Sequence, residues 1–311
     1  MWLAVCGTFV AFTMVFHWYV SRNKSSTSIQ RTTTNTTSSS VSGVSQSGAS
    51  PVSTAAAGEN NLIKSRDDSS HDHRSGPRRI TARRALIVIA HPDDECMFFG
   101  PTIIGLLKAS VEVYLLCLSS GNYRKEGLRR KVELRHSCQI LGIPLGNITV
   151  VEHTKLPDDP YLLWNKHVIR DIVLKHIEQL DIDTVISFDE GGVSGHLNHV
   201  SIHAALRHMY AKGAFPKDTS VFVLQTVNLL RKYTGLVDSV LSYVDGATHI
   251  FISSYFDILQ CQRAMVCYRS QLTWYRLLYI VFSRYMTVNT LRRISMGEKY
   301  YLLLDNLAKK N

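Results

Sequence analysis

Five short apolar runs alternate with longer helical patterns between residues 83 and 225, and this alternation constrains the fold more than any other feature. The runs expected as strands span residues 85–90, 111–117, 148–151, 184–188 and 220–225. The helical patterns span residues 101–109, 127–141, 161–180 and 198–211. Alternation of this kind implies right-handed crossovers and parallel strands. We therefore predict one α/β domain over residues 83–311, Rossmann-like, with a mostly parallel sheet and helices on both faces.

The residues before this domain differ from it in composition. Trp2 to Val20 form a nearly unbroken apolar stretch, long enough for one bilayer crossing and without the basic start or cleavage site of a signal peptide. We expect residues 1–20 to form one N-terminal transmembrane helix. Arg22, Lys24 and Arg31 follow it, so the positive-inside rule places the rest of the chain in the cytosol. Residues 21–82 are rich in Ser and Thr and poor in large apolar groups, which predicts a disordered tether.

The net charge narrows the possible partners, and the spacing of the cysteines indicates their redox state. A net charge of +10 suggests anionic partners such as phospholipid headgroups or nucleic acid. The basic residues are scattered, and no zinc-finger, RRM or KH pattern occurs, so we expect no nucleic-acid partner. Six cysteines without a CxxC spacing indicate reduced thiols rather than a disulfide framework.

The first expected strand runs directly into a cluster of ionisable residues. His91, Asp93, Asp94 and Glu95 follow it, at the strand end where open α/β sheets bind their ligands. Imidazole and carboxylates this close together suit a divalent metal with a base beside it. The alternative is a turn whose carboxylate caps the next helix.

A second cluster follows the fourth expected strand. A Gly-rich loop over residues 189–195 leads into a helix that carries His196 and His199, which share one face because they are three residues apart. If the two strands are neighbours, His91, Asp94 and His199 can converge on one metal, as in catalytic zinc sites. Manganese, cobalt or iron could also occupy such a site. The glycines do not match G-x-G-x-x-G, so we expect no dinucleotide cofactor.

Each remaining side chain of the two clusters has a role that fits its chemistry. Asp93, beside a ligand but turned away from the metal, is suited to be the general base. His196 can be the general acid for a leaving amine, or can stabilise an oxyanion. Glu95 or Asp189 can orient a ligand histidine.

These residues resemble the PIG-L/LmbE family of metal-dependent de-N-acetylases, which carries an HPDDE box and a later H-x-x-H. The resemblance extends over about residues 83–293. Further segments are similar to the eukaryotic branch of the family, namely residues 97–99, 120–123, 192–196, 268–272 and 282–286. That branch removes the N-acetyl group of N-acetylglucosaminyl-phosphatidylinositol, in the second step of GPI-anchor biosynthesis on the cytosolic face of the endoplasmic reticulum.

The resemblance implies functional residues position by position. It implies metal ligands at His91, Asp94 and His199. It also implies Asp93 as the base and His196 as the acid or oxyanion stabiliser. Arg130, in a G-x-x-R-x-x-E element, is implied to bind substrate, and its guanidinium fork can hold a phosphodiester. A solvated helix arginine is the alternative for Arg130. Tyr268 stands where close relatives are expected to carry His.

The same resemblance implies partners and a location. We expect a single-pass protein of the endoplasmic reticulum membrane, with its catalytic domain in the cytosol and GlcNAc-phosphatidylinositol as substrate in the bilayer. Protein partners cannot be predicted. The alternatives are a de-N-acetylase of another GlcNAc conjugate, and a catalytically silent, membrane-tethered lipid-binding protein. A two-His, one-carboxylate iron oxygenase would use His-x-Asp ligands on an all-β scaffold, whereas here His91 and Asp94 are three residues apart on an α/β pattern.

An aromatic and basic segment near the C-terminus is a candidate membrane surface. Its helical stripe comprises Trp274, Leu277, Leu278, Val281 and Tyr285, with Arg276, Arg284, Arg292 and Arg293 close in sequence. Such a helix can lie on a membrane surface beside the active site. The alternative is a helix packed on the sheet.

Overall fold

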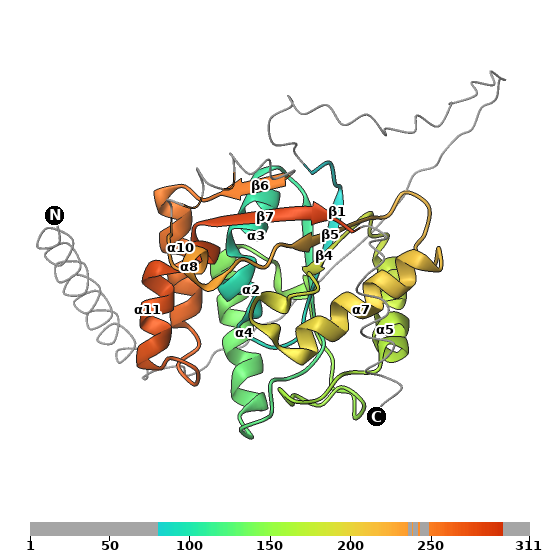
Figure 1. The fold of residues 1–311 in the computed structure, drawn as a ribbon, viewed down its shortest axis with the longest axis horizontal. Helices are drawn as coiled ribbons and strands as arrows, with labels where there is room; N and C mark the ends of the chain where they lie inside the picture. The colour runs from blue at the N-terminus through green and yellow to red at the C-terminus, as the bar shows by residue number, and fades with distance from the viewer. Residues whose placement is uncertain (1–79, 236–237, 239–241, 243–248, 295–311) are drawn as a thin grey trace, which may run out of the picture. The chain divides into compact units, whose positions relative to one another are not determined.

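The computed structural model describes residues 80–294, except residues 236–237, 239–241 and 243–248 (Figure 1). The predicted anchor and all but the last three residues of the predicted tether lie outside this part of the chain. Among the described residues, no helix is long and apolar enough to cross a membrane.

The described residues form a mixed sheet of seven strands in the order β3-β2-β1-β4-β5-β7-β6. The strands are β1 (Arg84–Ile89), β2 (Glu112–Cys117), β3 (Ile148–Val150), β4 (Thr184–Phe188), β5 (Ser220–Leu224), β6 (His249–Ile252) and β7 (Val288–Arg293). The strands from β3 to β5 are parallel, whereas β7 pairs antiparallel with both β5 and β6. The mostly parallel α/β architecture is therefore confirmed.

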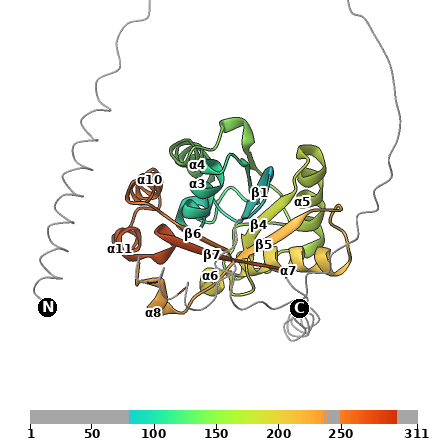
Figure 2. The same cartoon turned by 90° about the horizontal axis from the view of Figure 1, so that it is seen from above.

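Helices cover both faces of the sheet. They are α2 (Asp94–Phe98), α3 (Gly100–Lys108), α4 (Gly127–Leu141), α5 (Lys166–Leu180), α6 (Gly192–Gly195), α7 (Leu197–Ala211), α8 (Leu229–Lys232), α10 (Tyr255–Val266) and α11 (Trp274–Phe282). Two 3-10 turns, η1 (Leu145–Asn147) and η2 (Arg284–Met286), also occur. Figure 2 shows α3, α4 and α10 on one side of the sheet and α5 and α7 on the other.

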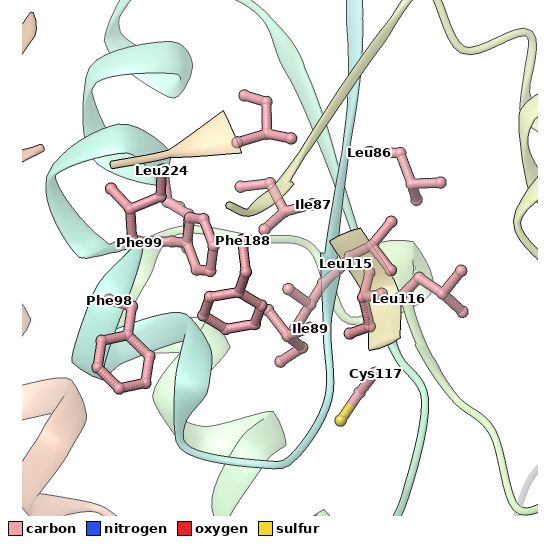
Figure 3. Packing of buried hydrophobic residues seen from close by; sticks show 14 of the residues in the cluster. Leu86, Ile87, Ile89, Phe98, Phe99, Leu115, Leu116, Cys117, Phe188 and Leu224 are labelled. Atoms are coloured by element: carbon pink, nitrogen blue, oxygen red, sulfur yellow. The ribbon is translucent and has the colours of Figure 1, made fainter. Parts of the chain in front are cut away.

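The central strands are buried on both faces, which explains why they read as continuous apolar runs rather than as alternating patterns. Ile87 and Ile89 of β1 are fully buried, and Phe188 at the end of β4 packs edge to face with Phe99 at a ring-centroid distance of 5.1 Å (Figure 3). Phe98 packs against the same Phe188 ring at 5.8 Å. These contacts pack the end of α2 against the end of β4.

One predicted helix begins later than expected. The pattern over residues 161–180 predicts a helix from Tyr161, but α5 begins at Lys166. Asn165 is its N-cap, and the Asn165 side chain accepts a hydrogen bond from the backbone N–H of His167 at 2.9 Å. The preceding residues belong to a loop that contributes a side chain to the candidate active site.

The prediction of a helical stripe near the C-terminus was only partly correct. Helix α11 ends at Phe282, so Tyr285 does not continue it and is buried in η2 instead. Arg284 is fully buried and pairs with Asp238 at 2.7 Å, so it is not a surface cation. Trp274 and Leu278 do lie on the exposed side of α11.

Candidate active site

The two ionisable clusters meet where the strand order of the sheet reverses. Strands β1 and β4 are neighbours, with Leu86 opposite Val185 and Ile87 opposite Ile186. From β1 the chain proceeds outward to β2 on one side, whereas β4 leads outward to β5 on the other. Open α/β sheets bind ligands at the carboxyl ends of the strands at such a switch point. The HPDDE box follows β1 and the H-x-x-H follows β4, so both reach this one edge.

Three imidazoles converge there. His91, His196 and His199 each offer a nitrogen, and the three nitrogens lie within 4.8 Å of one another. His91 and His199 are buried and His196 is half-buried. The sequence predicted that the two clusters would meet if their strands were neighbours. The two strands are neighbours, and the clusters do meet.

Asp94 reaches the same cluster. It begins α2, and its Oδ2 accepts hydrogen bonds from the backbone N–H groups of Ala90 (3.0 Å) and His91 (2.8 Å). The other oxygen, Oδ1, lies 3.3 Å from Nε2 of His199. Burial opposes ionisation of Asp94, but the neighbouring His199 and His91 outweigh burial and lower the pKa of Asp94. A carboxylate held charged in this position is suited to a cation.

His199 is oriented by its surroundings. Its Nδ1 lies 3.0 Å from the carbonyl oxygen of Gly192, and its ring stacks on Phe188 with centroids 3.9 Å apart and planes 1° apart. A carbonyl oxygen only accepts, so Nδ1 carries a proton, and Nε2 is the nitrogen directed at Asp94. Nε2 is buried and makes no hydrogen bond. A buried nitrogen left in this state, with the other ring N–H bonded to a carbonyl, fits a metal ligand.

His91 is held by a carboxylate that the sequence analysis missed. Its Nε2 lies 3.1 Å from Oδ1 of Asp158 and 3.0 Å from Oδ1 of Asn198, while its Nδ1 lies 3.7 Å from Oδ2 of Asp94. Burial lowers the pKa of His91, but the hydrogen bond to Asp158 and the charge of Asp94 prevail and raise it. Asp158 lies in the loop before α5, and no motif in the sequence pointed to it.

Asp93 lies beside the cluster in an unusual backbone conformation. Its φ angle is 110°, in the left-handed region, and its N–H donates to Oε2 of Glu95 at 3.1 Å. Its buried carboxylate contacts two guanidinium groups. Oδ2 is 2.6 Å from Nη1 of Arg276 and 3.3 Å from Nη2 of Arg130. Arg276 was expected only as a basic residue close to the candidate membrane-surface stripe, and its contact with Asp93 was not predicted.

Arg130 is buried rather than solvated. Its Nη1 donates to the carbonyl of Gly121 at 2.9 Å, its Nη2 donates to the carbonyl of Pro92, and Nη1 is 3.5 Å from Oδ2 of Asp158. Arg130 thus connects Asp93 to Asp158, and the solvated alternative is wrong. That Arg130 also binds substrate stays a prediction.

His196 is the N-cap of α7. Its Nδ1 accepts the backbone N–H of Asn198 at 3.3 Å, which leaves the proton of a neutral ring on Nε2. Burial, reinforced by the charges of His199 and His91, lowers the pKa of His196 to about 4. His196 is therefore neutral near pH 7 and can donate one hydrogen bond from Nε2.

Glu95 and Asp189 do not orient ligand histidines, contrary to our expectation. Glu95 accepts hydrogen bonds from the hydroxyls of Ser137 (2.6 Å) and Tyr268 (2.7 Å). Asp189 accepts the N–H of Thr226 at 2.6 Å and so holds the loop after β4. Both carboxylates are used to fix backbone segments around the site. Tyr268, at the position where close relatives are expected to carry His, lies in this buried network.

Comparison with known proteins places this geometry in a family. The model of the PIG-L family, described as GlcNAc-PI de-N-acetylase, matches residues 86–210. A Bos taurus N-acetylglucosaminyl-phosphatidylinositol de-N-acetylase is 50% identical over 208 residues, covering 67% of this chain and 82% of that protein. This chain belongs to the PIG-L family. A Dictyostelium discoideum protein, described as a probable enzyme of the same name, is 33% identical and covers 69% of this chain and 95% of its own length.

The PIG-L match includes both ionisable clusters, Arg130 and Asp158, but it ends before Arg276. Among solved structures, N,N'-diacetylchitobiose deacetylase from Pyrococcus horikoshii is similar with a TM-score of 0.51 at 17% identity. The likeness covers 71% of this chain and 89% of that one, and it supports the α/β fold alone.

Proposed function

We propose that this protein hydrolyses the N-acetyl group of N-acetylglucosaminyl-phosphatidylinositol, giving glucosaminyl-phosphatidylinositol and acetate. This is the second step of GPI-anchor biosynthesis. The observation that carries the proposal is the 50% identity to a Bos taurus protein of that name. The meeting of the HPDDE box and the H-x-x-H at one edge of the sheet supports it.

We further propose that His91, Asp94 and His199 hold one divalent cation. Zinc is the default for two imidazoles and a carboxylate, and manganese, cobalt or iron could replace it. The buried Nε2 of His199, without a hydrogen bond, supports this ligand set. His196 lies in the same cluster, but its Nδ1 accepts from Asn198 and its Nε2 carries the proton, which favours a hydrogen-bond donor over a ligand. When bound, the cation lowers the pKa of a water and polarises the acetamide carbonyl.

The other side chains supply proton transfer and charge stabilisation. In this proposal Asp93 takes the proton of the attacking water and returns it to the leaving nitrogen as the C–N bond breaks, while Arg276 and Arg130 hold the Asp93 carboxylate in place. His196 donates a hydrogen bond from Nε2 to the oxygen of the acetyl group as negative charge develops there. Its pKa of about 4 favours this oxyanion role over that of a protonated general acid.

We propose that the catalytic domain works on the cytosolic face of the endoplasmic reticulum, anchored by residues 1–20. The apolar stretch from Trp2 to Val20 and the basic residues after it support this arrangement. A lipid-linked substrate stays in the bilayer, so an anchored enzyme searches for it in two dimensions.

Acetate release from two substrates, one lipid-linked and one water-soluble, distinguishes this function from its alternatives. The full chain should release acetate from GlcNAc-phosphatidylinositol in vesicles. Release only from a water-soluble GlcNAc conjugate would favour the alternative de-N-acetylase. Binding of the lipid without release from either substrate would favour the catalytically silent protein.

A further inference from the structure

Three segments around the site present large apolar side chains to solvent. They are the residues at the start of α4 and in the loop before it, the loop before α5, and the first half of α11. Leu128 is 79% exposed, Tyr161 is 83% exposed and Trp274 is 74% exposed. We call the exposed residues of these segments the apolar rim, defined as Tyr123, Leu128, Tyr161, Leu162, Trp274 and Leu278.

Contacts on one side of the site place two of these segments next to the histidine cluster. Asp158, three residues before Tyr161, lies 3.1 Å from Nε2 of His91. The same carboxylate accepts the backbone N–H of Tyr123 at 3.0 Å. The loop before α5 and the loop before α4 are therefore joined beside the proposed metal ligands.

Contacts on the other side place the third segment. Glu133 of α4 accepts the backbone N–H of Ser270 at 3.0 Å, which ties α4 to the turn that precedes α11. Two residues after Trp274, Arg276 turns inward to Asp93. Figure 1 shows the start of α11, the lower end of α4 and the loop before α5 along the lower side of the drawing. The three segments that carry the apolar rim thus lie next to the site.

Most of the exposed charges beside the rim are basic. Arg124, Lys125 and Arg269 are exposed. Of the acidic residues within the same segments, Glu126 and Asp159 are half-buried and accept hydrogen bonds from Gln271 and from the backbone of Tyr161. Glu152 is exposed but pairs with Lys131 at 3.0 Å. Tyr and Trp side chains favour the boundary between lipid and water, and nearby Lys and Arg favour anionic headgroups. Aromatic, aliphatic and basic groups together match the surface of an anionic bilayer.

We propose that the apolar rim seats the mouth of the active site on the surface of an anionic phospholipid bilayer. This inference rests on the proposed function, because the reacting sugar of GlcNAc-phosphatidylinositol is joined to its lipid only through an inositol phosphate. A site with its mouth on the headgroups receives that sugar without extracting the lipid. A site whose mouth faced the cytosol would have to lift the acyl chains out of the membrane.

The test uses the full chain reconstituted into phosphatidylcholine vesicles that contain phosphatidylserine. The rim variant carries Tyr161→Glu and Trp274→Glu, two highly exposed positions where a carboxylate repels anionic lipid. The matched control carries Leu145→Glu and Tyr210→Glu. Leu145 and Tyr210 are 44% and 41% exposed. Leu145 lies before β3 and Tyr210 at the end of α7, so both are on the side of the amino ends of the parallel strands, whereas the site is at their carboxyl ends.

The first readout compares two substrates, GlcNAc-phosphatidylinositol in the vesicles and a water-soluble GlcNAc-inositol phosphate without acyl chains. The rim variant should lose roughly tenfold in kcat/KM on the vesicle substrate and retain its rate on the soluble one. The control should match the wild type on both. The second readout does not depend on activity. Vesicles with brominated acyl chains should quench a tryptophan emission that is present in the wild type and absent from Trp274→Phe.

Either of two results overturns the proposal. One is a kcat/KM of the rim variant that equals that of the control on the vesicle substrate, or that falls by the same factor on both substrates. An equal loss on both substrates would be a catalytic effect. The other is a Trp274 emission that brominated lipid leaves unchanged, as when residues 1–20, another part of the chain or a protein partner covers this surface. Wild-type protein that hydrolyses neither substrate would refute the proposed function, and the quenching measurement would still decide the surface.

Discussion

Arg276 and Asp93 lie 183 positions apart in the sequence, yet Nη1 of Arg276 is 2.6 Å from Oδ2 of Asp93. The contact joins α11, whose outer side is apolar and exposed, to the residue proposed as the general base. It also explains why α11 carries an arginine between hydrophobic neighbours. Tyr279, one turn later, donates its hydroxyl to the carbonyl of Met97 at 2.8 Å, so this inner side of α11 is fixed to α2.

Replacing Arg276 with Gln should lower kcat by roughly tenfold to a hundredfold, as for other groups that orient a catalytic residue. Asp93 would lose its nearest cation while Arg130 remains. Bound metal, measured by elemental analysis, should not change. Arg263→Gln, an exposed arginine on α10, is the matched control and should behave as the wild type. Equal kcat values for the two variants would contradict the role of the ion pair.

His199 and His203 lie one turn apart on α7 and are both buried, but only His199 belongs to the histidine cluster. His199→Ala should weaken metal binding by more than about a hundredfold and abolish turnover, since removal of a ligand exceeds the effect of removing a supporting group. His203→Gln should retain the metal, because its Nδ1 faces the carbonyl of Phe188 at 3.3 Å. Competition with a metal-binding dye measures both affinities. Loss of metal from both variants alike would count against the assignment of His199.

Glu95 should make the free energy of unfolding depend on pH. Burial raises the pKa of Glu95 from 4.5 to about 7, although the hydroxyls of Ser137 and Tyr268 oppose the shift. Between these two values the folded protein binds more protons than the unfolded chain. The stabilisation is therefore complete below about pH 4.5 and is lost as pH rises through about 7, on the order of 3 kcal/mol in total.

Denaturant unfolding between pH 5 and pH 8, roughly the range in which such a group titrates, measures this slope. Glu95→Gln should remove the part of the slope that Glu95 supplies. Ser137→Ala should move the transition to higher pH, because it deletes a donor that favours the charged carboxylate. Identical pH profiles for the wild type and Glu95→Gln would show that Glu95 does not titrate in this window.

Gly121 should be required for the position of Arg130. Its φ angle is +70°, and a Cβ there would lie 2.4 Å from Nη1 of Arg130. Gly121→Ala should lower the free energy of unfolding by about 1–3 kcal/mol and reduce turnover. Gly146→Ala is the control, because a Cβ at Gly146 meets nothing within 4 Å. Similar unfolding energies for the two variants would exclude the predicted clash.

Much of the sheet could be predicted because its strands are buried on both faces. The expected strand over residues 184–188 coincides with β4, and the expected helix over residues 127–141 coincides with α4. Strands β6 and β7 could not be predicted in the same way. Both are antiparallel to their neighbours in the sheet. Strand β6 has only four residues, and β7 contains Asn289, Arg292 and Arg293, so it does not read as an apolar run.

At the site, the residues that directly follow strands could be predicted from the sequence. The residues contributed by other loops and helices could not. His91, Asp94 and His199 come together because β1 and β4 are neighbours, a condition that the strand pattern made plausible. Asp158 lies in a loop whose sequence carries no motif, and only tertiary packing brings it to His91. The inward side of Arg276 could be recognised only after Tyr279 and Ile280, three and four residues later, were known to be buried.

The most direct test is acetate release from GlcNAc-phosphatidylinositol by the full chain, by Asp93→Asn, and by chelated protein before and after zinc is restored. We predict release by the wild type, loss on chelation and recovery with zinc. Asp93→Asn should still bind the metal but lose roughly a thousandfold in turnover, within the range for removal of a general base. Turnover by Asp93→Asn equal to that of the wild type, or wild-type release that survives complete removal of metal, would contradict the account.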